Sequence, residues 1–149
     1  MQKLLFVLLV LLGVTAKAQV KVPAKAITYV KEKYPSGEVD WSKEASNYKA
    51  EVATRDDNVT LSFNSAGNWL ETRSLLEEDD LPLGVVNTLE DDYPDHYVES
   101  VEYVVTPKEK FYKLVITDGD TYDQLRIASN GIILDTKVLD EEKEDEEWE

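Results

Sequence analysis

The stretch Leu61 to Arg73, which reads LSFNSAGNWLETR, recurs as Leu125 to Lys137, which reads LRIASNGIILDTK. The two stretches are 64 residues apart and share a leucine, a serine, a glycine, a second leucine and a threonine at matched positions. Identity at this many spaced positions indicates an internal duplication. The sequence therefore predicts two copies of one structural unit.

A second pair of matching segments lies N-terminal to each of these stretches and predicts two helices. Val22-Pro23 and Tyr34-Pro35 recur, 59 residues on, as Leu81-Pro82 and Tyr93-Pro94. Proline suits the first turn of a helix, and the residue before a proline disfavours helical geometry, so each pair brackets one helix. The expected apolar stripes are Ala26, Ile27, Val30 and Tyr34 in the first copy, and Val85, Val86, Leu89 and Tyr93 in the second. With polar residues opposite, this is the pattern of a helix that lies on a sheet.

The rest of each copy has the alternating pattern of β-strands. Tyr48 to Thr54 and Val59 to Phe63 alternate apolar and polar residues, with a turn-forming run between them. The second copy repeats this pattern around Asp118-Gly119-Asp120, and Asn130-Gly131 is a strong hairpin signal. Further strands are expected near residues 39–42, 68–73, 97–105 and 132–137. Five additional residues at 106–110 explain the change of offset from 59 to 64.

These observations predict an α+β fold of two tandem α-β-β-β-β repeats, with one antiparallel sheet and both helices packed on one face. We expect the first repeat at residues 19–76 and the second at 77–139. A short, partly apolar connector at 74–80 would join them. Residues 140–149 are almost entirely acidic and are expected to form a solvated, disordered tail.

The N-terminus has the pattern of a secretory signal peptide, predicted at residues 1–18. Lys3 precedes an apolar run of nine residues from Leu4 to Leu12, and Ala16-Lys17-Ala18 has the form that a signal peptidase cleaves. The run is much shorter than the roughly 20 residues needed to span a bilayer. Cleavage before Gln19 would leave a soluble, exported chain of 131 residues. An uncleaved N-terminal anchor is the alternative.

Composition excludes several classes of function. The chain contains 16 Lys and Arg, 31 Asp and Glu, one His and no Cys, which gives a formal net charge of −15 at pH 7. Direct binding to nucleic acid or anionic lipid is disfavoured because those partners carry the same sign of charge. Disulfides, thiolate metal sites and a catalytic cysteine are impossible.

The duplicated pattern resembles that of the PepSY-like proteins, which have a beta-lactamase-inhibitor-like fold. The resemblance rests on Val22-Pro23, Tyr34-Pro35, Trp41, Tyr48 to Val52, Phe63, Gly67, Trp69, Leu70 and their counterparts in the second copy. It implies a helix-on-sheet fold and a non-enzymatic role in the envelope of a Gram-negative bacterium. We expect the periplasm as the compartment, with secretion as the alternative. It implies no catalytic residue, cofactor or particular ligand. The sequence departs from the pattern where Ile132-Ile133 replaces Asn68-Trp69.

The face of the sheet away from the helices is the predicted binding surface. Alternation places on it Lys49, Glu51, Thr60, Ser62, Trp69 and Glu71 from the first copy, and Lys113, Val115, Arg126, Ile133 and Asp135 from the second. We expect an unknown protein or peptide of the envelope to bind there, with or without being inhibited by the chain. The expected contacts are Lys49, Glu51, Trp69, Glu71, Lys113, Val115, Arg126 and Ile133. Apolar side chains within a polar rim are typical of such surfaces. A one-residue slip would reverse every face, which leaves a purely structural role open.

Two other interpretations remain at this stage. Asp118, Asp120 and Asp123, with the acidic stretches, suggest a cation-responsive protein, although the spacing lacks a calcium-loop signature and hairpin-turn chemistry also explains the aspartates. His96 lacks an accompanying nucleophile, so a surface role is expected rather than general base catalysis. No phosphate loop, nucleophile motif or metal-ligand cluster is recognisable, and we therefore predict neither an enzyme nor a cofactor.

Overall fold

The computed structural model of the chain describes residues 19–139, and the element order in that range is helix, four strands, helix, four strands. The first copy consists of α1 (Ala24–Lys33), β1 (Glu38–Glu44), β2 (Asn47–Ala53), β3 (Asn58–Phe63) and β4 (Trp69–Leu76). The second consists of α2 (Leu83–Asp92), β5 (Tyr97–Val105), β6 (Lys110–Thr117), β7 (Tyr122–Ile127) and β8 (Ile133–Leu139). The predicted tandem α+β fold is confirmed. The predicted signal peptide at 1–18 and tail at 140–149 lie outside the described residues.

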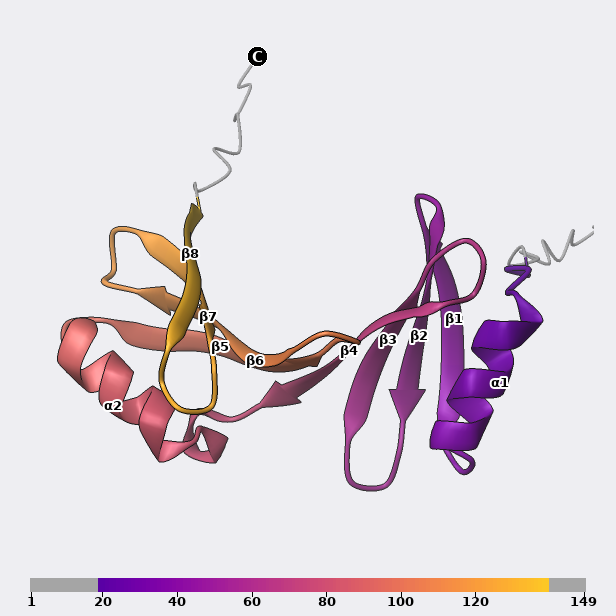
Figure 1. Ribbon diagram of the computed structural model, residues 1–149, viewed down its shortest axis with the longest axis horizontal. Helices are drawn as coiled ribbons and strands as arrows, with labels where there is room; N and C mark the ends of the chain where they lie inside the picture. The colour runs from indigo at the N-terminus through magenta and orange to yellow at the C-terminus, as the bar shows by residue number, and fades with distance from the viewer. Residues whose placement is uncertain (1–18, 140–149) are drawn as a thin grey trace, which may run out of the picture.

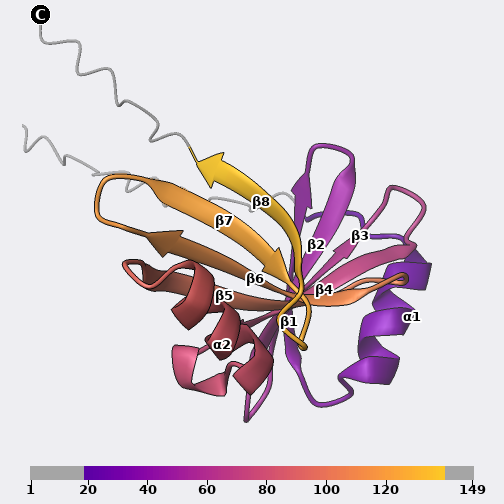
Figure 2. The ribbon, with the colours of Figure 1, turned by 60° about the vertical axis from the view of Figure 1, so that its left-hand side comes forward.

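The strands form one antiparallel sheet of eight strands in chain order, from β1 at one edge to β8 at the other. Strand β4 pairs with β5 through residues 72–76 and 101–105, so the sheet continues across the two copies (Figure 1). The sheet twists strongly, and the two helices lie near opposite ends of the molecule (Figures 1 and 2).

The predicted connector at 74–80 is wrong over its first three residues, because Ser74 to Leu76 belong to β4. These residues pair with β5, so extending the strand supplies partners for backbone groups of both copies. The link outside the strands is short and contains the 3₁₀ turn η1 (Glu78–Asp80).

Each helix covers its own hydrophobic core. Under α1, the buried residues are Ala26, Val30, Ala50, Val52, Val59, Leu61 and Phe63. Under α2, they are Leu81, Val85, Val101, Leu114, Ile116, Leu125 and Ile127. The helix stripes are as predicted except at one position. Tyr29 of α1 packs against the first core beside Ala26 and Val30, whereas Ile27 is half-buried and lies outside that cluster.

The recurring glycine of the duplicated stretch lets the turn between two strands approach a helix. Gly67 and Gly131 both have positive φ, 82° and 89°, in the turns after β3 and β7. A Cβ on Gly131 would lie 2.3 Å from the backbone oxygen of Gly84 in α2. The Thr88 hydroxyl donates a hydrogen bond of 2.8 Å to the carbonyl of Gly131 and so ties α2 to this turn. The position therefore needs glycine for both its backbone geometry and its close packing.

Candidate functional site

Both helices pack against the same face of the continuous sheet, which leaves the opposite face open. Residues paired directly on neighbouring strands share one face of the sheet. One such row begins in the first core and ends in the second, and it contains Val59, Ser74, Tyr103, Tyr112 and Ile127. These five residues therefore share the helix face. We call the opposite surface the open face. Its middle row, in register, contains Asp40, Glu51, Thr60, Arg73, Val104 and Phe111.

Most of the residues predicted for the open face lie on it. They are Lys49, Glu51, Thr60, Ser62 and Glu71 in the first copy, and Lys113, Val115, Arg126 and Asp135 in the second. Sequence reasoning missed Arg73, Leu75 and Glu102, which lie among them. Continuing the alternation beyond Glu71 would have found Arg73, but Leu75 had been assigned to the connector.

The prediction that Trp69 faces outward is wrong. A β-bulge in β4 places Glu71 opposite Ser62 and Trp69 opposite Phe63, so Trp69 turns to the helix face. There its ring stacks on Tyr29, with centroids 5.7 Å apart and planes 16° apart. Its Nε1–H donates a hydrogen bond of 3.0 Å to the Thr72 hydroxyl. Trp69 is therefore part of the first core.

The same prediction fails at Ile133 for the same reason. A second bulge, in β8, places Asp135 opposite Arg126 and Ile133 opposite Ile127. Ile133 consequently packs against the second core and does not contribute to the open face. The signal for both bulges is a pair of adjacent large apolar residues at the start of the strand, since simple alternation would send one of the two into solvent.

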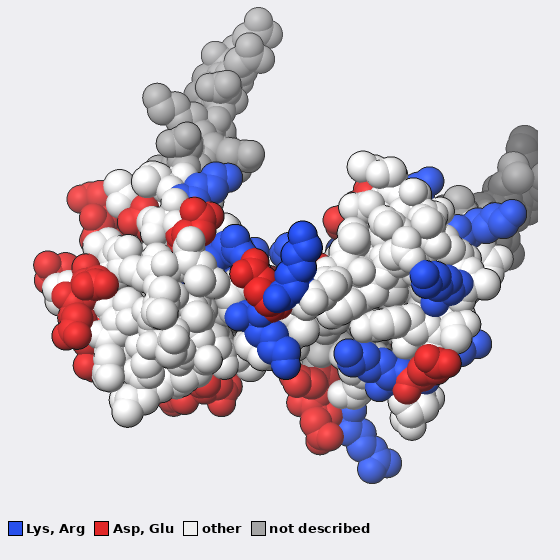
Figure 3. Space-filling model, in the orientation of Figure 1, with Lys and Arg blue, Asp and Glu red and all other residues white. Residues whose placement is uncertain are grey.

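A chain of ion pairs crosses the open face where the two copies join. The Arg73 guanidinium lies 2.6 Å from the carboxylate of Glu71 and 3.9 Å from that of Glu102. Glu102 also pairs with the Lys113 ammonium at 2.7 Å. Charged side chains of both signs gather at the waist between the two lobes (Figure 3). The seam is therefore linked by side chains on the open face as well as by backbone pairing.

Lys49 belongs to a separate charged group on the first copy. Its ammonium lies 3.1 Å from a carboxylate oxygen of Glu44 and 3.1 Å from one of Glu51. Side-chain hydrogen bonds to these two carboxylates, Glu44 first, raise the pKa of Lys49 above its ordinary value. Lys49 thus remains cationic over the whole physiological range.

Arg126 is on the open face but is engaged within the chain. Its guanidinium lies 4.2 Å from the centroid of the Phe111 ring and pairs with Glu109 in the turn before β6. Phe111 and its neighbour Val104 are buried although they belong to the open face. Arg126 therefore covers the apolar pair Val104 and Phe111 at the end of the β5–β6 hairpin. To make its predicted contact with a partner, Arg126 would have to give up these contacts within the chain.

The first copy carries a groove of about 600 Å³ on the open face. The open-face side chains that line it are Glu38, Asp40, Glu51, Ala53, Asn58, Thr60, Arg73, Leu75 and Glu102. Leu75 is 70% exposed. The groove thus combines two apolar side chains, Ala53 and Leu75, with four carboxylates and one guanidinium.

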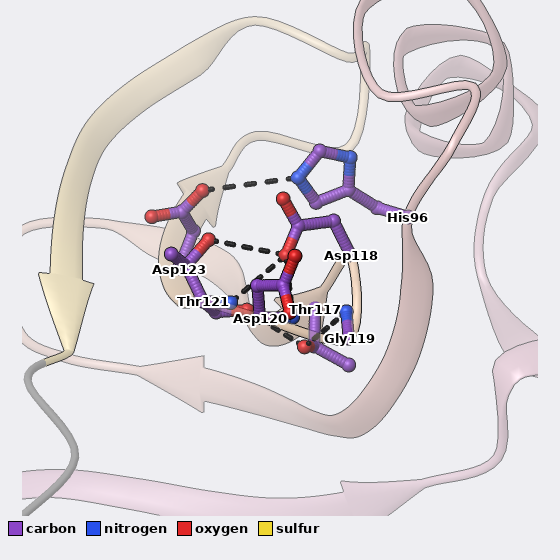
Figure 4. Close-up of polar contacts among 7 residues, drawn as sticks. All are labelled: His96, Thr117, Asp118, Gly119, Asp120, Thr121 and Asp123. Carbon is purple, nitrogen blue, oxygen red and sulfur yellow. Dashed lines mark hydrogen bonds and ion pairs between the residues drawn. The ribbon is translucent and has the colours of Figure 1, made fainter.

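The aspartates considered as calcium ligands lie at the β6–β7 hairpin, with Asp118 and Asp120 in its turn and Asp123 in β7 (Figure 4). Oδ1 of Asp118 accepts hydrogen bonds from the backbone N–H groups of Asp120 and Thr121, at 2.9 and 2.8 Å. These backbone hydrogen bonds, chiefly that from Thr121, lower the pKa of Asp118. His96 lies beside this turn, with Nε2 4.0 Å from Asp123. Within residues 19–139, no group of three or more His, Cys, Asp or Glu side chains has the geometry to hold a metal ion.

The sequence from residue 46 to residue 135 matches the family described as "Putative beta-lactamase-inhibitor-like, PepSY-like". The match covers more than half of the chain, and the chain belongs to this family. The resemblance inferred from the duplicated motifs is confirmed.

Solved structures share the fold. A DUF2874 family protein from Bacteroides ovatus is 25% identical with a TM-score of 0.73, over 80% of this chain and 89% of its own. A DUF2874 family protein from Bacteroides uniformis is 22% identical with a TM-score of 0.72, over 79% and 90%. A BLIP-like protein from Bacteroides fragilis is 19% identical with a TM-score of 0.73, over 82% and 89%.

No curated protein sequence matches the chain. Among the described residues, neither helix has the length and apolar character that crossing a membrane requires.

Proposed function

We propose that this chain is a non-enzymatic, exported protein of the cell envelope that binds a protein or peptide through the open face of its sheet. The observation that carries the proposal is that both helices cover one face, whereas the other presents a groove and charged side chains to solvent. A sheet face left without a covering layer is available to a partner.

Export is supported by two further observations. Residues 1–18 have the signal-peptide pattern described above. A solved structure with the same fold, 18% identical with a TM-score of 0.70, carries the description "putative periplasmic proteins" and comes from Bacteroides eggerthii. We expect cell fractionation to recover the chain outside the cytoplasm, with Gln19 as its first residue by mass spectrometry. Recovery of an uncleaved chain in the cytoplasm would contradict export.

Photo-crosslinking tests the binding face. A benzophenone amino acid is introduced at Glu51 or Asp135, which are exposed on the open face, and the protein is irradiated in envelope extract. Control positions are Thr28 and Asn87, which are exposed on α1 and α2. The proposal expects a discrete crosslinked product from the open-face positions and none from the controls. Equal products from both sets, or none from either, would count against it.

A further inference from the structure

We propose that the groove on the first copy takes an extended peptide segment that presents basic side chains and, further along the same face, an aliphatic side chain. The inference rests on the proposed function and specifies the chemistry of the partner. It uses three features of the groove: its position on the uncovered face, the exposed Leu75, and the sign of its unpaired charge.

The position of the groove is suited to an extended chain. The groove spans β1 to β4, with Glu102 of β5 closing one end. Its open-face residues fall into two adjacent register rows, one through Asp40, Glu51 and Thr60, and the other through Glu38, Ala53 and Asn58. A peptide that lies along these rows crosses one strand about every 4.8 Å, so the three steps from β1 to β4 span about 14 Å, which is the reach of about four extended residues.

The net charge of the groove indicates which side chains a bound peptide should carry. Glu102 is paired with Lys113, and Glu51 with Lys49, while the single base of the groove, Arg73, is paired with Glu71 and Glu102. Among residues 19–139, Glu38 and Asp40 form no ion pair. The uncompensated charge is therefore negative and lies at the β1 end, where a lysine or arginine of the partner would gain and an acidic side chain would be repelled.

Leu75 distinguishes a peptide from a simple cation. It lies directly opposite Glu102 and is 70% exposed, so an aliphatic side chain bound beside it would remove apolar surface from water. A polyamine or a metal ion satisfies the carboxylates and gains little from the leucine. An extended segment with the two kinds of side chain an even number of residues apart presents both on one face and so uses both features of the groove.

Three synthetic hexapeptides test the inference with the full chain. The lysine–leucine peptide is Lys-Ser-Lys-Ser-Leu-Ser, in which the lysines and the leucine share one face. The lysine–serine peptide has serine in place of the leucine, and the glutamate–leucine peptide has glutamate in place of both lysines. Binding is followed by amide shifts in heteronuclear NMR and by calorimetry, at low and at high salt. We expect the lysine–leucine peptide to bind tightest, to shift residues of β1 to β3, and to weaken as salt rises.

Matched variants separate the groove from general electrostatics. The double variant E38Q/D40N removes two charges inside the groove, whereas E90Q/D91N removes two exposed charges from α2. Binding of the lysine–leucine peptide is expected to weaken about fivefold in the first variant and to remain unchanged in the second. The variant L75S should reduce that peptide to the affinity of the lysine–serine peptide, and circular dichroism of each variant checks its fold.

Several results would overturn the inference. They are equal weakening by the two double variants, tighter binding of the glutamate–leucine peptide, shifts confined to other surfaces, and no binding of the lysine–leucine peptide at millimolar concentration. None of these decides the proposed function, which depends on the crosslinking experiment. An open face that crosslinks to an acidic segment would keep the proposed function and remove this inference.

Discussion

Replacing Trp69 by alanine is expected to lower the free energy of unfolding. It is not expected to weaken binding in the way that loss of an exposed contact residue would. The ring stacks on Tyr29, and its indole N–H donates to the hydroxyl of Thr72. The half-buried side chain packs against the core under α1. If the residue were on the open face, as alternation alone predicts, the same change would leave stability nearly intact.

The size of the effect follows from these contacts. If the half-buried ring removes about 100 Å² from water, the hydrophobic contribution is about 2.5 kcal/mol at 25 cal/mol per Å². The stacked pair and the hydrogen bond each contribute about 1 kcal/mol. Relaxation of the neighbours offsets part of this sum, so we expect the free energy of unfolding to fall by about 3 kcal/mol. In a chain of this size that corresponds to a melting temperature lower by about 10 °C.

Urea unfolding followed by circular dichroism measures the change, with the slope of the transition as a check on two-state behaviour. W69F keeps most of the ring and loses the N–H donor, so it should cost about 1 kcal/mol. L70A is the matched control, because Leu70 is the neighbouring apolar residue but is exposed at the bulge, and it should cost less than about 1 kcal/mol. Equal stability of W69A and the unmodified chain would refute the assignment of this side chain to the core.

Three further expectations concern the turns and the seam. G131A should lower the free energy of unfolding by about 3 kcal/mol, because its new methyl group would meet the backbone of Gly84. G119A is the matched control: its φ has the same sign but open space surrounds it, so it should cost about 1 kcal/mol. Thermal melts measure both variants. E102Q removes the carboxylate shared by two cations and should cost about 1 kcal/mol at low salt and much less in 1 M NaCl; an undiminished cost at high salt would mean that the ion pairs are not its cause. The pKa of Asp118 is lowered in the folded state, so the stabilisation by its charge is present above the unfolded pKa of about 3.9. This stabilisation is lost as pH falls through the folded value. The difference in melting temperature between D118N and the unmodified chain should therefore shrink below about pH 4. A difference that is constant from pH 7 to pH 2.5 would contradict this.

The duplicated stretch made the topology predictable, because the same helix and turn signals occur twice and constrain each other. Tyr34-Pro35 and Tyr93-Pro94 mark both helix ends, and the glycine in each copy marks a turn that the structure shows packed against a helix. The face of the sheet to which each side chain points was predictable wherever strand pairing is regular, as at Lys49 and Glu51 in β2.

The rest depended on pairing that the sequence signals weakly. A bulge adds one residue to a strand, and every side chain before it then changes face, which is why Trp69 and Ile133 were misplaced while Glu71 and Asp135 were not. The extent of β4 could not be read either, because Leu75 and Leu76 are adjacent apolar residues followed by acids, which is also the composition of a linker. Pairing with β5 decides that they are a strand.

The seam between β4 and β5 has a consequence for how such proteins can change in length. The two copies are joined by the same antiparallel ladder that joins neighbouring strands within each copy, and each helix covers a core of its own. A further copy could therefore be appended at either margin without redesigning the existing ones. Growth of this kind would widen the uncovered face of the sheet in proportion to the number of units.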